Sequence, residues 1–408
     1  MMHRLIQTAV LLIAIVPASQ LSAQPVDSLR IMTFNVWSGE GTQAGRDKLR
    51  EIMLAGGADI IGVQELDDSA GRSIAAAMGF HYYQQSGGDI QVISRYPIVA
   101  HSPANLGVNI ALSPTQNVWL FNAHLAPYPY QPYDLQDGIL PKNESAVIAA
   151  ANAARGGQVT TYLNDMASVL GSGVPVFFTG DFNEPSFLDW TAEAASATPR
   201  PFDLKVEYPA SKRIVDAGMT DSFRAVRPDE VGDTAYTWTP GYPYPIISSN
   251  EVHDRIDIIY HAGAGVTATS AFTVGPVDGN PNTHLSVAGY NADHRAVVVQ
   301  YEISISGCSL FGDLNSDCSL DSADWSMFRT GQFRDMTGLT PAQAFTMGDL
   351  NGDFRNNHAD FVIFKRAFES AHGADAFAAL LARVPEPSTI FLTIVVVCTG
   401  LMIRRAGL

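Results

Sequence analysis

The chain has 408 residues, of which 46% are hydrophobic, and a formal net charge of −16. This length suits one large domain with additional segments, and the apolar fraction is enough for a sizeable core. The acidic balance argues against a protein that attracts nucleic acid or anionic membrane through a basic surface, although bound metal ions can supply positive charge locally.

Residues 1–23 have the pattern of a secretory signal peptide. His3 and Arg4 precede a short apolar run, and small residues follow between Ala18 and Ala23. The alternative is a first membrane helix, for which the apolar run is short. We therefore expect the protein to be exported.

Residues 27–304 alternate short apolar runs with helical stretches. The runs are rich in Val, Ile, Phe and Tyr and are short enough to be strands. They are "RIMTFNVW", "ADIIGVQEL", "IQVISRYPIV", "NVWLFNAHL", "VPVFFTGDF", "RIDIIYH" and "HRAVVVQYEI". One helix is predicted from near Asn143 to Gly156 and Gly157, and a second ends on Gly171. The alternation predicts a layered α/β domain.

Polar side chains follow several of these runs at the point where each strand should end. They are Asn35, Glu65, His124, Asp181 and Asn183. Strands of one sheet would bring such residues to a common edge, where open α/β sheets bind their ligands. The side-chain oxygens of Asn35, Glu65, Asp181 and Asn183 suit a hard cation such as Mg²⁺ or Mn²⁺. The neighbouring residues of the "TGDFNEP" stretch, Glu184 and Pro185, are interpreted as turn residues.

Two later stretches, "HDRIDII" and "NADHRAV", add Asp257 and His294. An aspartate that accepts a hydrogen bond from one imidazole nitrogen fixes the tautomer of the ring and raises its basicity. Such a pair beside a metal can handle a proton and favour negative charge on a phosphoryl group.

Seven short stretches resemble the motifs of one family, and they occur in the same order along the chain. They are "MTFNVW", "VQEL", "SRYPI", "NAHL", "GDFNEP", "DRIDII" and "ADHRAV". The chain resembles the endonuclease/exonuclease/phosphatase family, the metal-dependent phosphoesterases that include DNase I-like nucleases, neutral sphingomyelinases and inositol phosphatases. The resemblance covers residues 31–297. It implies a four-layer sandwich in which two mixed β-sheets pack between helices.

The resemblance also implies roles for particular residues. Glu65 would bind the catalytic metal directly, with Asn35 beside it, and Asp293 would assist.

The remaining residues would perform the reaction. Asp181 would orient and deprotonate the attacking water, and Asn183 would hold the phosphate or the water. His124 would contact the phosphate, and His294, paired with Asp257, would stabilise the transition state. The expected reaction is an in-line attack of water on a phosphate ester.

We expect the substrate to be a phosphodiester, because the resemblance places His124 where diesterase branches of the family have a histidine. The alternatives are a phosphomonoesterase that acts on a small substrate and a non-catalytic, calcium-dependent surface-binding protein. The stretches "APYPYQPYDLQDG" and "TWTPGYPYPIISSNEVHD" are either rigid loops or aromatic walls of a substrate pocket. No Arg-rich stretch marks a polyphosphate or nucleic-acid site.

A duplicated acidic pattern, "GDLNSDCSLDSAD" and "GDLNGDFRNNHAD", follows the α/β domain. Oxygen donors recur at positions 1, 3, 5, 9 and 12 of each copy, which is the spacing of a twelve-residue calcium loop. They are Asp313, Asn315, Asp317, Asp321 and Asp324, then Asp349, Asn351, Asp353, Asn357 and Asp360. Position 6 is Cys318 or Phe354 where such loops usually have glycine.

Residues 308–372 are therefore similar to a type I dockerin, a small α-helical module that binds Ca²⁺ and docks to a cohesin. An intramolecular or surface-tethering role is an equally open interpretation. Cys308 and Cys318 are near enough in sequence to pair, which spacing alone does not decide.

Residues 384–408 resemble a PEP-CTERM sorting signal. "VPEPS" precedes a short apolar stretch, and Arg404 and Arg405 end it. The resemblance implies export and sorting to the cell envelope or surface, with cleavage and release. A permanent anchor is the alternative, although the stretch is marginal for a transmembrane helix.

Overall fold

The computed structural model describes residues 26–383 apart from residues 38–40, 114–115, 171, 173, 198–202, 304–309 and 316. The predicted signal peptide and the predicted sorting signal lie outside these residues. Across the stretch that is described, no helix combines the length and apolarity needed to cross a membrane.

The first of two β-sheets has seven strands and is mixed. Its strands are β1 (Ser28–Asn35), β2 (Ile60–Gln64), β3 (His81–Gln84), β4 (Ile90–Ser94), β11 (Val266–Pro276), β12 (Leu285–Val287) and β13 (Ala296–Ile303). Their order is β12-β11-β13-β1-β2-β4-β3. Strand β1 runs parallel to β2 and antiparallel to β13.

The second sheet has six strands and is also mixed. Its strands are β5 (Ile98–His101), β6 (Gly107–Ser113), β7 (Gln116–His124), β8 (Val176–Asp181), β9 (Thr220–Asp221) and β10 (Asp257–Ala262). Their order is β5-β6-β7-β8-β10-β9. Strands β7 and β8 are parallel, whereas β8 and β10 are antiparallel.

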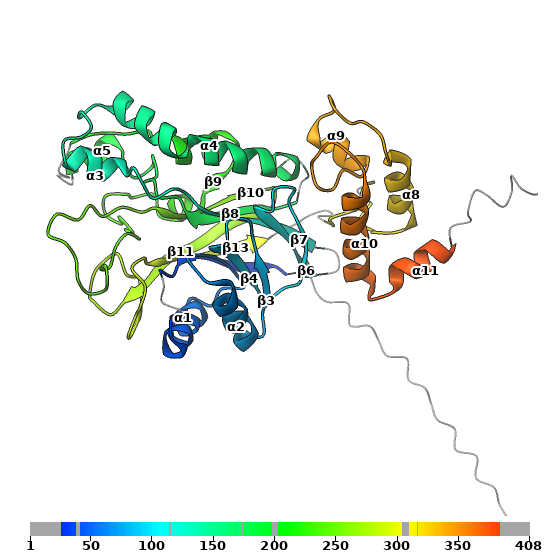
Figure 1. Cartoon of the computed structure of the whole chain (residues 1–408), viewed down its shortest axis with the longest axis horizontal. Coiled ribbons are helices and arrows are strands. Elements are labelled where there is room, and N and C mark those ends of the chain that lie inside the picture. Colours follow the sequence, from blue (N-terminus) through cyan, green and yellow to red (C-terminus); the bar gives the residue numbers. More distant parts are fainter. Residues whose placement is uncertain are drawn as a thin grey trace, which may run out of the picture.

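The described part of this domain also contains seven helices. They are α1 (Gln43–Gly56), α2 (Asp68–Met78), α3 (Gln131–Gln136), α4 (Glu144–Leu170), α5 (Ala192–Ala197), α6 (Pro209–Asp216) and α7 (Ser222–Val226). Helices α1 and α2 pack on the seven-stranded sheet, and α4 packs on the other (Figure 1).

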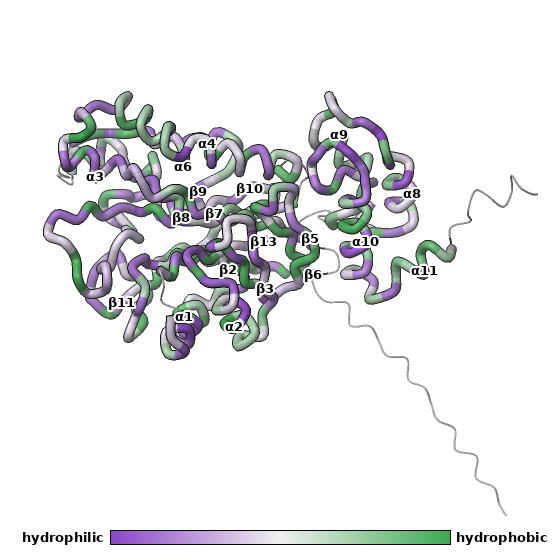
Figure 2. The backbone as a smooth tube through the Cα atoms, viewed as in Figure 1, coloured by the Kyte–Doolittle hydropathy of each residue, from purple (hydrophilic) through white to green (hydrophobic). Residues whose placement is uncertain are grey.

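A separate apolar cluster, which includes Ile31, Ile60, Leu120 and Phe177, fills the space between the sheets. In Figure 2 hydrophobic segments run through the middle of the molecule, and hydrophilic ones lie on α1. The predicted arrangement of two mixed sheets flanked by helices is confirmed.

Two of the predicted elements were wrong in detail. The run from Ile90 to Val99 is not one strand but two, β4 and β5, which belong to different sheets. Pro97 has no amide hydrogen to give to a sheet, so the chain leaves one sheet there and enters the other.

The predicted helix end at Gly156 and Gly157 is also wrong, because α4 continues through both glycines to Leu170. Val147, Val159 and Met166 are buried along its length. This packing outweighs the roughly 1 kcal/mol that each glycine costs a helix.

The predicted calcium-loop region forms a helical module at one end of the sandwich (Figure 1). Its helices are α8 (Ser322–Gly331), α9 (Pro341–Thr346), α10 (His358–His372) and α11 (Ala376–Arg383). The ring of Phe311 lies 5.5 Å from that of Trp119 in β7. Helix α10 contacts β5, and Gly352 lies so close to Ser168 of α4 that no Cβ would fit between them. The module therefore shares a hydrophobic core with the sandwich.

Both acidic loops curl around their first aspartate. Asp313 accepts hydrogen bonds from the backbone N–H groups of Asp317 and Cys318 at 3.3 and 3.0 Å. Asp349 accepts the equivalent bond from Phe354 at 2.9 Å. Cys318 and Phe354 have positive φ, 76° and 61°, so position 6 is left-handed without glycine.

The last aspartate of each loop, Asp324 or Asp360, is buried and bonded to backbone N–H groups. Asp321 and Asn357 cap α8 and α10. Cys318 is exposed, and Cys308 lies outside the described residues.

Candidate active site

The ends of strands from both sheets meet at one edge of the sandwich. Asn35 ends β1 and Glu65 directly follows β2, while His124 and Asp181 end β7 and β8. The side-chain amide of Asn35 donates to Glu65 Oε1 and to Asp181 Oδ2, both at 3.0 Å. One amide therefore connects carboxylates that belong to different sheets.

Two turn residues after the strands have left-handed backbone. Glu65 has φ 58° and Asn183 has φ 47°. The N–H of Asn183 donates to Asp181 Oδ1 at 2.9 Å, and its side chain donates to the carbonyl of Leu125 at 2.9 Å. Asparagine tolerates this conformation because its side chain can bond nearby backbone. The turn after β8 is thus fastened to the chain that follows β7.

A buried aspartate–histidine pair faces Asp181. His294 Nδ1 lies 2.8 Å from Asp257 Oδ2, and its Nε2 lies 3.8 Å from Asp181 Oδ2. The backbone N–H of Asp257 donates a hydrogen bond to the hydroxyl oxygen of Thr237 at 3.1 Å. Burial disfavours the imidazolium, but Asp257 and Asp181 outweigh it and raise the pKa of His294 to about 10. His294 is therefore a hydrogen-bond donor at neutral pH.

A second histidine approaches from the other side. His124 Nε2 lies 3.6 Å from Glu65 Oε1, and its Nδ1 lies 2.7 Å from Asp89 Oδ2. Burial lowers the pKa of His124, but Asp89 and the site carboxylates reverse the shift and raise it. Sequence reasoning missed Asp89. It stands before β4, and nothing in its local pattern indicates its partner.

The carboxylates of this edge fit a divalent cation. One oxygen of Asp257 and one of Asp293 are buried, and neither has a hydrogen-bond partner within the described part of the chain. Burial raises the pKa of Asp293 to about 7 and also raises that of Asp181. Buried carboxylate oxygens that lack a hydrogen-bond partner are costly unless a cation offsets them. Hard oxygen ligands of this kind suit Mg²⁺ or Mn²⁺.

Among the described residues, Asp181, Asp257 and His294 offer ligand atoms that lie within 4.8 Å of one another. Because Asp257 and His294 already bond each other, we expect a cation beside Asp181 and Glu65 instead. Asp293, which directly precedes His294, lines the same pocket.

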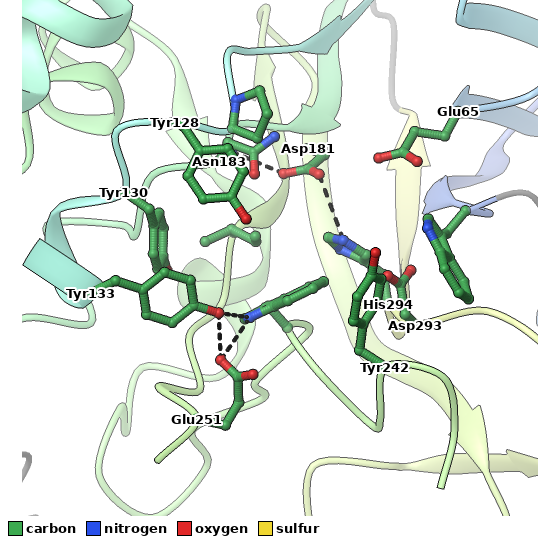
Figure 3. Close-up of a pocket in the computed structure, with 14 residues that line it drawn as sticks. Glu65, Tyr128, Tyr130, Tyr133, Asp181, Asn183, Tyr242, Glu251, Asp293 and His294 are labelled. Atoms are coloured by element: carbon green, nitrogen blue, oxygen red, sulfur yellow. Dashed lines mark hydrogen bonds and ion pairs between the residues drawn. The ribbon is translucent and has the colours of Figure 1, made fainter. Parts of the chain in front are cut away.

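A pocket of about 350 Å³ opens beside these residues. Glu65, Asp181, Asn183, Asp293 and His294 line one part of it. Aromatic side chains line the rest, as Figure 3 shows for Tyr128, Tyr130, Tyr133 and Tyr242. Asn35 and His124 contact the lining through Glu65, and Asp257 contacts it through His294. The structure thus brings together all eight residues that sequence analysis assigned to metal binding and catalysis.

Glu184 is not a simple turn residue, contrary to its interpretation from sequence. It is buried, and its Oε1 accepts a hydrogen bond from the N–H of Ala210 at 2.6 Å. Its Oε2 lies 4.0 Å from Arg155 of α4. Glu184 therefore joins the turn after Asp181 to α4 and α6, which no local pattern could reveal.

The model of the endonuclease/exonuclease/phosphatase family matches residues 32–287. A relative of uncharacterized function from Caenorhabditis elegans, F14F9.5, is 27% identical over 300 residues, which are 67% of this chain and 91% of that protein.

Solved structures are similar at lower identity. TDP2 from C. elegans is 15% identical, with a TM-score of 0.40 over 67% of this chain and 75% of that one. An endonuclease/exonuclease/phosphatase from Beutenbergia cavernae is 15% identical, with a TM-score of 0.41 over 69% of this chain and 74% of that one.

Proposed function

This chain belongs to the endonuclease/exonuclease/phosphatase family, and we propose that it is an exported, divalent-metal-dependent phosphodiesterase. Family membership establishes a phosphoester hydrolase fold, and the substrate class and residue roles are our proposal. The observation that carries it is the amide of Asn35, which holds Glu65 and Asp181 together opposite the Asp257–His294 pair.

We assign metal binding to Glu65 and Asp293, with Asn35 beside them. A bound Mg²⁺ or Mn²⁺ supplies positive charge to a phosphoryl oxygen and positions the ester.

Asp181 accepts the proton of the attacking water, and Asn183 holds the water or a phosphoryl oxygen. His294 donates a hydrogen bond to the phosphoryl group as negative charge develops on it, and Asp257 keeps the imidazole in that orientation. His124 contacts a second phosphoryl oxygen.

A phosphodiester fits this site better than a phosphomonoester. A diester carries one negative charge, whereas a monoester at neutral pH carries nearly two. No lysine or arginine belongs to the described lining of the pocket. The lining therefore lacks the cationic side chains that a second phosphate charge would favour.

The test is Mg²⁺-dependent hydrolysis of bis(p-nitrophenyl) phosphate by the full chain. We expect Asp181→Asn to lose about 10³-fold or more of kcat, the scale of a group that acts in the transition state. The matched control, Asp47→Asn on exposed α1, should keep full activity. An active Asp181→Asn protein, or preference for p-nitrophenyl phosphate, would contradict the assignment.

We also propose that the helical module binds Ca²⁺ through the ten loop residues named above. Support comes from the two loops, which fold alike around Asp313 and Asp349 although one has Cys318 and the other Phe354 at position 6. A cohesin-like or other cell-surface partner remains part of this proposal. Its test is a calcium-dependent pull-down with a cell-envelope fraction, in which recovery of nothing would count against it.

Export and C-terminal sorting are proposals from the sequence alone. Mass spectrometry of protein made in a secreting host should find an N-terminus after Ala23. Retention of the intact N-terminus in the cytoplasm would contradict export.

A further inference from the structure

The pocket beside the candidate metal site has two aromatic walls. Tyr128, Tyr130 and Tyr133 come from the chain between β7 and α4. The rings of Trp37 and Tyr242 are 4.7 Å apart on the other side, and Trp238 lies 6.0 Å from Tyr242. Aromatic faces carry partial negative charge, which attracts cations.

The carboxylate of Glu251 forms hydrogen bonds to both aromatic walls, at the end of the pocket away from the candidate metal site. Glu251 Oε1 accepts hydrogen bonds from Tyr133 Oη at 2.5 Å and from Trp238 Nε1 at 3.1 Å. Across the residues that the structure describes, Oε2 of Glu251 has no hydrogen-bond partner. Figure 3 shows Glu251 across the pocket from Glu65. Its charge is thus separate from the carboxylates that would face a metal.

The rings are held in place before any ligand arrives. Tyr130 donates to Asp254 at 2.9 Å, and its ring lies 4.9 Å from that of Tyr133. Glu251 holds Tyr133 and Trp238 together. A pocket whose walls are fixed in this way loses little conformational entropy on binding.

The charge of the lining points to the ligand. Four carboxylates line the pocket: Glu65, Asp181, Asp293 and Glu251. The only positive side chain in its described lining is His294, which is already paired with Asp257. Glu65, Asp181 and Asp293 would face a bound divalent metal, which would also hold the phosphate. Glu251 and the surrounding rings then lack a positive partner.

We infer that the substrate is a zwitterionic phosphodiester, whose ammonium group, quaternary as in a choline ester, lies among these rings beside Glu251. This inference rests on the proposed function and names its substrate class. The phosphate binds at the metal site, and the cation binds in the aromatic part of the pocket. A nucleotide base would also stack on these rings, but it gives Glu251 no positive charge to bind.

Two sources could present this group: a lipid head group in a membrane and a soluble phosphodiester. Tyr128 and Tyr242, at the mouth of the pocket, are 72% and 53% exposed, and the nearby Ile246 is 64% exposed. The experiment therefore compares both sources.

Three p-nitrophenyl phosphodiesters test the inference with the full chain. They carry choline, its uncharged carbon isostere 3,3-dimethylbutanol, or thymidine. In each reaction water attacks phosphorus, the bond to the aryl oxygen breaks, and p-nitrophenolate, a proton and the phosphomonoester are released. We expect kcat/KM for the choline ester to exceed that for the isostere by about 10-fold or more, the scale of a desolvated cation–π contact.

Variants assign this preference to the pocket. Glu251→Gln should lower the choline-to-isostere ratio, although the rings remain, and Tyr128→Ala, at an exposed position, should lower the ratio as well. Glu51→Gln on α1 is the matched control and should keep the ratio. Sphingomyelin vesicles and glycerophosphocholine then serve as the two natural-type probes, and faster cleavage of one identifies the source.

The other possible results separate failure of the substrate inference from failure of the proposed function. If all three esters are cleaved with a ratio near one, or if the thymidine ester is preferred, the inference is wrong and the phosphodiesterase stands. Cleavage of neither natural-type probe also overturns the inference. If no ester is cleaved with any divalent metal, the proposed function itself fails.

Discussion

Glu184 lies one residue beyond the candidate catalytic turn and has an unusual environment. Its 4.0 Å distance to Arg155 is at the outer limit of an ion pair. Burial raises the pKa of Glu184 to about 7 and lowers that of Arg155. Both shifts have the same cause, because desolvation outweighs the attraction between the two charges. The folded protein therefore favours protonated Glu184 below neutral pH.

This shift makes stability depend on pH. The folded-state pKa exceeds the unfolded value, so folding takes up a proton between about pH 4.5 and pH 7. Stability should fall as pH rises through that window, by about 3 kcal/mol, and stay lower above it. Glu184→Gln should remove this decrease. Urea unfolding at several pH values measures it, with exposed Glu193→Gln as the control. Equal pH profiles for wild type and Glu184→Gln would contradict the prediction.

For some residues of the candidate site, the place in the site could be predicted from the sequence, and for others it could not. Asn35, Glu65 and Asp181 directly follow apolar runs, so their placement at a strand end is a local property. Asp89 and Glu251 act on partners far along the chain, His124 and Tyr133. Only the folded topology brings such pairs together, and a single sequence does not show it.

The same distinction applies to whole elements. The buried central strands are continuous apolar runs and could be predicted. Strand β11 mixes Thr and Ser with apolar residues, and its burial depends on pairing with β13. Helix α4 continues through two glycines for the same reason, since tertiary packing overrides local propensity.

The two acidic loops allow a prediction at this scale. A ligand that binds only the folded state stabilises it, by about 2.7 kcal/mol at 100 times its Kd. We therefore expect Ca²⁺ to raise the melting temperature of the full chain. Joint substitution of Asp313→Asn and Asp349→Asn should abolish the rise, while Asp335→Asn, outside the loops' ligand positions, should keep it. A rise that persists in the double variant would exclude these loops as its cause.

At the scale of the whole molecule, the module and the sandwich share one core. Phe311 and Phe364 of the module belong to the same apolar cluster as Trp119 and Met166 of the sandwich. The two parts should therefore unfold together and not as independent units.

Phe311→Ala tests this coupling. Phe311 is 1% exposed, and truncation of a buried phenylalanine typically costs about 3 to 5 kcal/mol. The loss should appear both in unfolding of the whole chain and in thermal inactivation of phosphodiester hydrolysis. Phe333→Ala, at a site that is 86% exposed in the same module, should change neither. Unchanged thermal inactivation in Phe311→Ala would show that the parts are independent.

The contact between α10 and β5 also bears on how the protein behaves in concentrated solution. Strand β5 is the outermost strand of its sheet, and an outer strand carries unpaired N–H and C=O groups that can recruit a strand from another molecule. Helix α10 lies against it. A fragment without the module would present this strand openly, so its first defect would be self-association into aggregates even where its chemistry survived.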